Sequence, residues 1–335
     1  MPDRLNVAVI GCGGHAQHHF RMIGAEPRLH LTALCELDPT RLEAAAETHG
    51  PVRTFDDYRR LLDEVSDLHV VHVTTMPGHL VDIVLDCLDR GLHVHVEKPP
   101  GMSSNDTQRM ADAAARSTGK AIVSFNRRYM PQILAVRRLA QSAGGAVHVS
   151  GTYNKPLTTL GTPAMAGITP DPVVCDALHH VDLIRWLAGD GDTAARPVEV
   201  HSIVADGPRD GSHRHNAIVR FEGGAIGQFS SHYGVGARIQ QAEVHAEDLS
   251  AYLDLSGTPR VELFQAESQP QGTTQTRPDP PRLDLDAVGG EHFDEVQHFT
   301  DCIFEDRQPW STLGDAVHSM RLAEAIRSGH QGALS

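Results

Sequence analysis

The sequence predicts an α/β protein, in which a doubly wound parallel sheet is followed by an α+β domain with a large, open, mostly antiparallel sheet. Over residues 1–125, short apolar runs alternate with helical segments, as in parallel sheets covered by helices. After residue 125 strand-like runs dominate, and Glu222-Gly223-Gly224 is a hairpin signal between two of them. We therefore expect one domain at 1–125 and a second at 126–335.

The first domain reads as strands and helices in alternation. The predicted strands are Leu5–Ile10, Leu29–Cys35, Val52–Thr54, Leu68–Thr74, a run that starts at Gly91 and stops at Pro99, and Ala121–Phe125. Helices are predicted after the first strand and at Pro39–His49, Asp56–Leu62, His79–Arg90 and Ser103–Ser117.

The second domain is predicted to hold a meander of strands with few helices. The strands are Ala146–Tyr153, Val198–Ala205, His215–Phe221, Ala225–His232, Ile239–Ala246 and Ser250–Leu255. The helices are Gln132–Ser142, Asp176–Leu187, Glu291–Phe304 and Leu313–Ser328. Residues 266–290 read as a long polar loop, and we expect the closing helices, 291–328, to pack back toward the first domain.

Composition narrows the possible functions. The chain has 335 residues, enough for two cores, and a net charge of -14, which argues against nucleic-acid and anionic-membrane partners. No apolar run approaches the ~20 residues that span a bilayer, and we expect no signal peptide before Leu5. The five cysteines contain no Cys-x-x-Cys pair, as expected for reduced thiols. We expect a cytoplasmic protein.

The segment after the first strand has the pattern of a dinucleotide-binding turn. Gly11-Cys12-Gly13-Gly14-His15-Ala16 gives Gly-x-Gly-x-x-Ala at the start of a helix. The first glycine permits the tight turn, the second permits close approach of a pyrophosphate, and the small sixth residue permits close packing of helix and strand. The phosphates would lie at the helix N-terminus, where free N–H groups favour anions.

An acidic residue ends the second strand. Glu36 is placed to accept hydrogen bonds from ribose hydroxyls and to repel a 2′-phosphate, and Leu37 and Asp38 follow it in place of an arginine. The pattern therefore favours NAD over NADP. The alternative is a structural βα turn with a surface glutamate.

Further candidates lie where later strands end. Ligands bind parallel sheets at the carboxyl ends of the strands. The expected cofactor contacts there are Thr74, Thr75, Pro77, Glu97, Lys98 and the junction residue Asn126. The sequence has 29 basic residues, and only Lys98, Lys120 and Lys155 are lysines. Because lysine can lose its proton and arginine effectively cannot, Lys98 is a candidate for chemistry.

Several of these motifs together resemble the Gfo/Idh/MocA family of oxidoreductases, the relatives of glucose–fructose oxidoreductase and inositol dehydrogenase. The resemblance rests on the glycine turn, Glu36, Glu97-Lys98-Pro99, Asn126-Arg127-Arg128-Tyr129 and the segment from His179 to Leu187. It implies a Rossmann domain, a second domain with an open sheet, NAD(P)-dependent oxidation or reduction of a sugar, inositol or related polyol, and homodimers or homotetramers that pack sheet against sheet.

The same resemblance assigns the site residues. It makes Lys98 the active-site lysine, with a cis peptide bond before Pro99, and makes His179 the catalytic histidine. The family usually has an aspartate four residues before that histidine. Here that position is Cys175 and Asp176 is only three before, so the third catalytic position falls to one of these two residues.

The chemistry of alcohol oxidation suits this pair. A base must take the hydroxyl proton while positive charge stabilises the alkoxide. Histidine titrates nearest neutral pH, so His179 suits the base and Lys98 the electrostatic role. Asp176 would orient His179 or accept a substrate hydroxyl. A core or helix-cap role for His179 and a surface role for Lys98 are the alternatives.

Other residues keep two interpretations. Arg127 contacts the substrate or the lysine strand, or else forms an interdomain salt bridge. Lys155 binds substrate hydroxyls or a carboxylate, or is a solvated lysine. Histidines cluster at His15, His18 and His19, at His179 and His180, and at His213 and His215. No third ligand is evident beside His15 and His19, and we expect no metal.

The leading hypothesis is an NAD-dependent sugar or cyclitol dehydrogenase. A redox-neutral enzyme that keeps NAD bound, of the epimerase or glycoside-cleaving type, is the second hypothesis. A nucleotide- or sugar-binding sensor without turnover is the third. Substrate choice is expected to depend on the loops at 155–171 and 266–290.

Overall fold

The computed structural model describes residues 2–334 apart from 160–171, 209–211, 267–282 and 291. The chain divides into two compact units, each discontinuous in sequence. The first contains residues 1–125 and 294–317, and the second contains residues 126–293 and 318–335. The predicted substrate-choice loops fall largely outside the described residues, as does residue 291 of the predicted closing helix.

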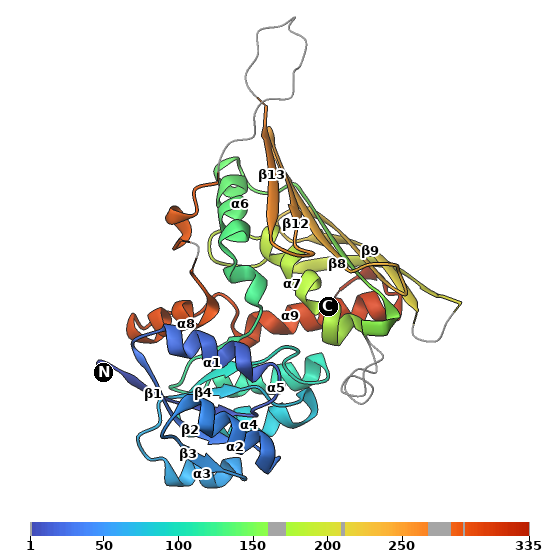
Figure 1. The fold of residues 1–335 in the computed structure, drawn as a ribbon. Coiled ribbons are helices and arrows are strands. Elements are labelled where there is room, and N and C mark those ends of the chain that lie inside the picture. The colour runs from blue at the N-terminus through green and yellow to red at the C-terminus, as the bar shows by residue number, and fades with distance from the viewer. Residues whose placement is uncertain (1, 160–171, 209–211, 267–282, 291, 335) are drawn as a thin grey trace, which may run out of the picture. The chain divides into compact units, whose positions relative to one another are not determined.

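Among the described residues, the first unit has a six-stranded parallel sheet in the order β3-β2-β1-β4-β5-β6 (Figure 1). The strands are β1 Leu5–Ile10, β2 Leu29–Cys35, β3 Arg53–Phe55, β4 Val70–Val73, β5 His93–Val96 and β6 Ala121–Val123. The chain leaves the sheet centre in one direction through β3 and in the other through β6. This is the doubly wound topology that the alternation predicted.

Helices connect these strands, and several of them begin with a side-chain cap. The helices are α1 Ala16–Ala25, α2 Pro39–His49, α3 Tyr58–Glu64, α4 Pro77–Asp89, α5 Ser104–Ala114 and, from the C-terminal segment, α8 Glu295–Phe304. Asp38 caps α2 by accepting the N–H groups of Thr40 and Arg41, and Ser103 caps α5. Side-chain caps satisfy N–H groups that have no partner inside the helix.

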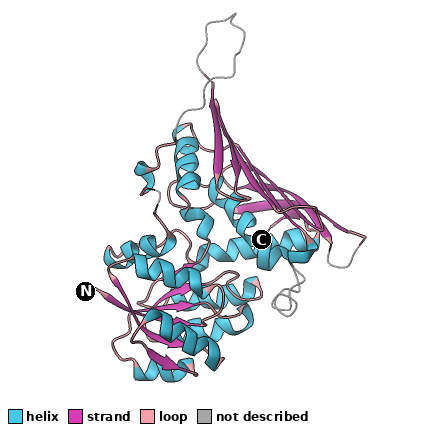
Figure 2. Ribbon diagram, in the orientation of Figure 1, coloured by secondary structure: helices cyan, strands magenta, loops and turns pink. Residues whose placement is uncertain are grey.

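The second unit contains, among its described residues, an eight-stranded sheet in the order β13-β12-β11-β7-β10-β9-β8-β14. Figure 2 shows these strands as a broad magenta sheet. The strands are β7 His148–Lys155, β8 Pro197–Asp206, β9 His213–Phe221, β10 Ile226–Tyr233, β11 Ile239–Ala246, β12 Leu249–Asp254, β13 Arg260–Gln265 and β14 Gln331–Ala333. Only the β7–β10 pair is parallel among the described pairings, so the predicted mostly antiparallel sheet is confirmed.

Helices lie on this sheet and close the chain. They are α6 Pro131–Ser142, α7 Leu178–Leu187 and α9 Leu313–Ser328, which begins in the first unit and ends in the second. Helix α7 packs against β7 and β10, and every residue of α7 except His179 is buried. No helix in the described part of the chain is long and apolar enough to cross a membrane.

The structure corrects three predictions in the second domain. A π-helical turn, Val173–Ala177, precedes α7 where the sequence predicted one α-helix from Asp176. Strands β13 and β14 were missed, because β13 has a single buried residue and includes the charged Arg260 and Glu262, and β14 is short and contains Gly332. The helix predicted from Glu291 begins at Glu295, behind an Asp294 cap.

Candidate functional site

The glycine turn of the first unit is fixed by its contact with the end of β4. Gly11 has a φ of +96°, and a Cβ atom there would lie 2.9 Å from the backbone nitrogen of Thr75. The Thr74 hydroxyl donates to the Gly11 carbonyl at 2.5 Å. A larger residue at position 11 would therefore be strained in conformation and would collide with backbone. Gly14 and His15 are exposed, and α1 begins at Ala16.

Glu36 connects the end of β2 to this turn. Its Oε2 accepts the N–H of Cys12 at 2.9 Å, and its Oε1 accepts the N–H of Asp38 at 3.0 Å. Each carboxylate oxygen has a second lone pair, so both can also accept a hydroxyl proton. Burial and the Glu36 charge raise the pKa of the Cys12 thiol to about 12, which keeps it neutral beside the carboxylate.

The predicted contacts at the end of β4 form a short loop before α4. Thr74 is buried, and Pro77 is the first residue of α4. The Thr75 hydroxyl oxygen is buried and has no hydrogen-bond partner among the described residues. A buried hydroxyl without a partner costs free energy, which a bound ligand would recover.

The Glu97-Lys98-Pro99 segment follows β5, and the cis peptide bond expected before Pro99 is present. Glu97 Oε1 accepts from His19 Nε2 at 2.9 Å, and Glu97 Oε2 accepts the N–H of Lys98 at 2.9 Å. Burial alone would raise the pKa of the Glu97 carboxyl, but the His19 hydrogen bond and the Lys98 charge together lower it. Glu97 is therefore ionised, and its carboxylate accepts the backbone N–H of Lys98.

In the second unit, three side chains donate hydrogen bonds to one carboxylate, that of Asp176. Tyr153 Oη donates to Oδ1 at 2.9 Å and Lys155 Nζ donates to the same oxygen at 2.7 Å. Tyr233 Oη donates to Oδ2 at 3.0 Å. We call Asp176, Tyr153, Lys155 and Tyr233 the Asp176 cluster.

Strand geometry explains how this cluster forms. Tyr153 and Lys155 are two residues apart on β7, so their side chains share one face of the sheet. Tyr233 is the register partner of Lys155 on the parallel strand β10. The π-helical turn carries Asp176 above the same face. Burial, reinforced by the Asp176 charge, raises the pKa of Tyr153, so its phenol stays a donor.

The predicted base lies close by in sequence. His179 is partly exposed in the first turn of α7, whereas His180 is buried with its ring 5.0 Å from that of Tyr153.

Arg127 donates to the side-chain oxygen of Gln240. Burial lowers the pKa of Arg127 to about 10. Asn126 is exposed.

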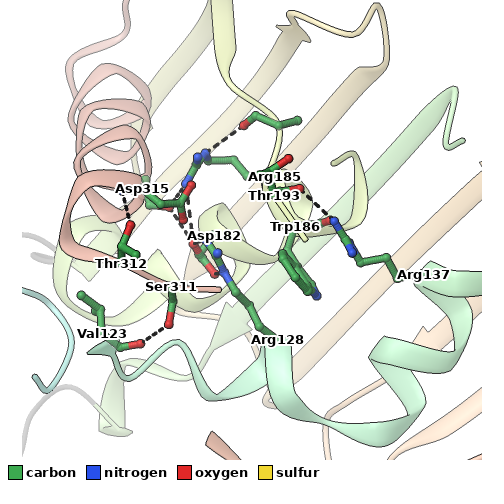
Figure 3. A network of polar contacts seen from close by, with 12 residues as sticks. Val123, Arg128, Arg137, Asp182, Arg185, Trp186, Thr193, Ser311, Thr312 and Asp315 are labelled. Carbon is green, nitrogen blue, oxygen red and sulfur yellow. Dashed lines mark hydrogen bonds and ion pairs between the residues drawn. The ribbon is translucent and has the colours of Figure 1, made fainter. Parts of the chain in front are cut away.

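A buried ion-pair network contacts the side chain of Asp182 on α7 (Figure 3). Arg128 Nε donates to Asp182 Oδ2 at 2.8 Å, and Arg128 Nη2 donates to Oδ1 at 2.5 Å. Ser319 also donates to Asp182, and the guanidinium of Arg137 lies 3.6 Å from the centre of the Trp186 ring. These contacts agree with a structural interpretation of Asp182.

The sequence reasoning missed both tyrosines of the Asp176 cluster. Tyr153 could have been found, because it is the last residue of a predicted strand and lies two residues before Lys155. Tyr233 could not, since its approach depends on the parallel pairing of β7 with β10. Lys155 is ion-paired with 17% of its side chain exposed, so it is not a freely solvated lysine.

Comparison with known proteins confirms the family resemblance. Residues 5–125 match the Gfo/Idh/MocA family model, described as an oxidoreductase family with an NAD-binding Rossmann fold. Levoglucosan dehydrogenase of Pseudarthrobacter phenanthrenivorans is 26% identical over 263 residues, which are 67% of this chain and 66% of that protein. Inositol 2-dehydrogenase of Ralstonia nicotianae is 28% identical over 200 residues, 58% of this chain and 57% of that protein.

These matches thus span slightly under two thirds of the first curated relative and less of the second. A solved structure of levoglucosan dehydrogenase in complex with NADH has a TM-score of 0.80 at 19% identity. The superposition covers 99% of each chain, so the two share a fold over their whole length.

Proposed function

We propose that this chain, whose residues 5–125 form an NAD-binding Rossmann domain of the Gfo/Idh/MocA oxidoreductase family, transfers hydride between nicotinamide and a hydroxyl or keto carbon of a sugar, inositol or related polyol. Two curated relatives are named levoglucosan dehydrogenase and inositol 2-dehydrogenase, which supports this substrate class. The observation in the chain itself that carries the proposal is the Asp176 cluster. A carboxylate that accepts from two phenols and an ammonium is suited to bind a ligand with several hydroxyl groups.

The choice of NAD is supported by the geometry at Glu36. Its carboxylate is fixed by the N–H groups of Cys12 and Asp38, directly beside the glycine turn. A fixed negative charge there accepts ribose hydroxyls and repels a 2′-phosphate. The exposed side chain that follows is Leu37, which offers no charge to a phosphate.

The roles proposed for Lys98 and His179 are the two that alcohol oxidation requires besides a hydride acceptor, namely stabilising the alkoxide and removing the hydroxyl proton. Bound NAD would supply the hydride acceptor. His179 takes the proton of the substrate hydroxyl, and Lys98 stabilises the oxygen as negative charge develops on it. Glu97 positions Lys98 through its backbone N–H. The substrate loses two electrons and two hydrogens, one as hydride and one as the proton held by His179.

Lys155 and Asp176 are proposed to bind substrate hydroxyls. The Lys155 ammonium has donors left after it contacts Asp176, and its side chain is partly exposed. Arg127 is proposed to help form the same polar surface, because it lies within the electrostatic reach of Tyr153 and Asp176.

The experiment is a substrate panel. The purified chain is incubated with NAD and a set of sugars, anhydrosugars and cyclitols, and with NADH and the corresponding ketoses, while reduced nicotinamide is followed by absorbance. We expect at least one polyol to reduce NAD, and Lys98→Met to lower kcat by about 10²-fold or more, as for loss of an electrostatic stabiliser. No turnover in either direction across the panel would contradict the proposal.

The same preparation tests the two other hypotheses. NAD that co-purifies and is never released in net reduced form, while a sugar is isomerised or cleaved, would indicate redox-neutral turnover. Nucleotide binding that survives in Lys98→Met, with no chemistry in either protein, would indicate a sensor.

We also propose a cytoplasmic homo-oligomer that forms through the open sheet. The sheet's outer face carries exposed Ile203, Ile218 and Tyr252, which are 71%, 53% and 41% exposed. Ile203 and Ile218 lie on the neighbouring strands β8 and β9, and exposed apolar side chains side by side favour a protein interface. We expect Ile218→Asp to reduce the molar mass measured by light scattering. A mass equal to one chain in the unmodified protein would contradict this proposal.

A further inference from the structure

Three histidines meet in the core of the first unit, and only His19 belongs to a group that spacing along the sequence had singled out. His72 on β4 and His95 on β5 are register partners in the parallel sheet, so their side chains share a face. Their rings are stacked, with centroids 4.6 Å apart and planes 5° apart. His19, on α1, meets both rings edge-on. All three side chains are buried, with at most 1% exposed.

Several nitrogen atoms of these buried rings have no hydrogen-bond partner among the described residues. His19 Nδ1 and His72 Nδ1 are 2.9 Å apart and share one hydrogen bond. His72 Nε2 and both ring nitrogens of His95 are buried with no hydrogen-bond partner among the described residues. A leucine at position 95 would fill the space without the cost of a buried, unpaired N–H group. Packing alone therefore does not account for imidazole at these positions.

One carboxylate beside the rings, that of Glu97, has the arrangement found at metal centres. His19 Nε2 faces Glu97 Oε1 at 2.9 Å, which leaves Nδ1 to face the other two rings. A histidine that binds a metal usually donates its other N–H to a carboxylate in this way. On α8, Glu295 Oε1 lies 3.8 Å from His95 Nε2. Glu295 Oε2 is buried and has no partner among the described residues.

We propose that His19, His72 and His95 bind a divalent transition-metal ion of the zinc type, each through one ring nitrogen, and that Glu295, whose Oε1 now accepts from the Ser124 hydroxyl at 2.7 Å, moves toward them to become the fourth ligand. The three ligand atoms lie within 4.8 Å of one another. Tetrahedral zinc with Zn–N bonds of about 2.0–2.1 Å places ligand nitrogens roughly 3.4 Å apart. Binding therefore requires the most distant pair to approach by up to roughly 1.4 Å, and the stacked rings of His72 and His95 to turn so that one nitrogen of each faces the ion.

Three neutral imidazoles and one carboxylate suit this ion. Imidazole is a ligand for zinc, copper and nickel, whereas magnesium and calcium prefer oxygen. With four protein ligands and no exposed side chain, the site has the closed coordination of a structural zinc site rather than the open position of a catalytic one. It would tie α1, β4, β5 and α8 together and hold Glu97 next to Lys98.

The test measures metal content and stability in the full-length chain, purified without a histidine tag. The chain is expressed with and without added Zn²⁺, dialysed, and analysed by inductively coupled plasma mass spectrometry. We expect about one zinc per chain and a melting temperature several degrees higher in the zinc-loaded protein, because a ligand that binds only the folded state stabilises it. Co²⁺ added during refolding should give the visible absorption of tetrahedral cobalt.

Two variants locate the ion. His95→Gln should lose both the zinc and the cobalt absorption, while His30→Gln, an exposed histidine of the same unit, should keep them. If His95→Gln fails to fold, the metal content and melting temperature of the zinc-free and zinc-loaded unmodified protein still test the proposal. Metal below about one tenth per chain with no change in melting temperature would overturn the proposal. Equal zinc in His95→Gln would overturn it as well, because the ion would then be bound elsewhere.

Discussion

The ammonium of Lys155 lies 2.7 Å from the carboxylate of Asp176, and the hydroxyl of Tyr153 meets the same carboxylate oxygen at 2.9 Å. A single aspartate thus fixes a charged donor and a neutral donor on one face of the second unit's sheet. The aspartate is in a π-helical turn, a feature that is frequent at functional sites.

Asp176→Asn is therefore expected to lower kcat/KM by about 10- to 10²-fold, since a hydrogen bond to a charged group contributes roughly 1.5–3 kcal/mol. The affinity for NADH should stay the same, because Glu36 and the glycine turn are unchanged. Steady-state kinetics and a nicotinamide fluorescence titration measure the two quantities. Asp192→Asn, at an exposed aspartate of the same unit, is the matched control, and an unaltered kcat/KM in Asp176→Asn would remove Asp176 from the site.

Cofactor choice is expected to depend on Glu36. Replacing it in the double variant Glu36→Ser/Leu37→Arg removes the carboxylate that repels a 2′-phosphate and adds a guanidinium that can pair with one. We expect the ratio of kcat/KM for NAD to that for NADP to fall by at least about 10²-fold. Leu37→Arg alone is the control and should shift the ratio less. If the double variant kept the original preference, another part of the chain would determine it.

Stability is expected to depend on the buried Arg128–Asp182 pair. Asp182→Asn leaves a buried guanidinium without its counter-charge, which typically costs about 3–5 kcal/mol. The exposed pair of Arg220 and Glu199 offers the comparison, since solvent screens such a pair and Glu199→Gln should lower the free energy of unfolding much less. Urea denaturation followed by circular dichroism measures both values. A loss of under about 1 kcal/mol in Asp182→Asn would show that the network adapts to the missing charge.

The stability of the first unit is expected to fall in acid because of His298. Burial lowers the pKa of His298 from 6.5 to about 3, and Trp310 donates its backbone N–H to the ring at 3.2 Å. The unfolded chain binds a proton at this residue below pH 6.5 and the folded chain does not. The contribution is therefore complete above pH 6.5 and is lost as the pH falls toward 3, at up to roughly 1.4 kcal/mol per pH unit.

His298→Gln should accordingly flatten the pH dependence of the free energy of unfolding by about one proton between roughly pH 6 and pH 4. Urea titrations at a series of pH values measure the slope. His30→Gln, which replaces an exposed histidine, should leave the slope unchanged. An identical slope in His298→Gln and the unmodified chain would mean that this residue is already protonated in the folded state.

Local sequence signals predicted the first unit closely. Strands β1 and β2 have the predicted bounds. The apolar run of β1 ends at the glycine turn and that of β2 ends at Glu36, so the sequence itself marks both ends. The cis bond before Pro99 was also expected, although only through the family resemblance. Short elements such as β3 and β6 shifted by one or two residues, where propensity is weak and sheet pairing sets the ends.

Contacts between segments far apart in the chain could not be predicted from local sequence patterns. Tyr233 joins Asp176 only because β10 pairs with β7 in parallel, and no local pattern specifies that pairing. In the same way, His72 and His95 become neighbours through the register of β4 and β5. The sequence reasoning weighed histidines by their spacing along one segment, and so grouped His19 with His15 and His18 instead.

The discontinuity of the first unit has a consequence for biosynthesis. The Ser311 carbonyl accepts the N–H of Val123 on β6 at 2.8 Å, the Ser311 hydroxyl donates to the Val123 carbonyl at 2.7 Å, and α8 also belongs to this unit. A nascent chain that has reached residue 125 thus exposes an open sheet edge and uncovered apolar surface until about 170 more residues emerge. Such a chain is a natural client for ribosome-associated chaperones, and a protein truncated at the apparent domain boundary would carry the same exposed edge permanently.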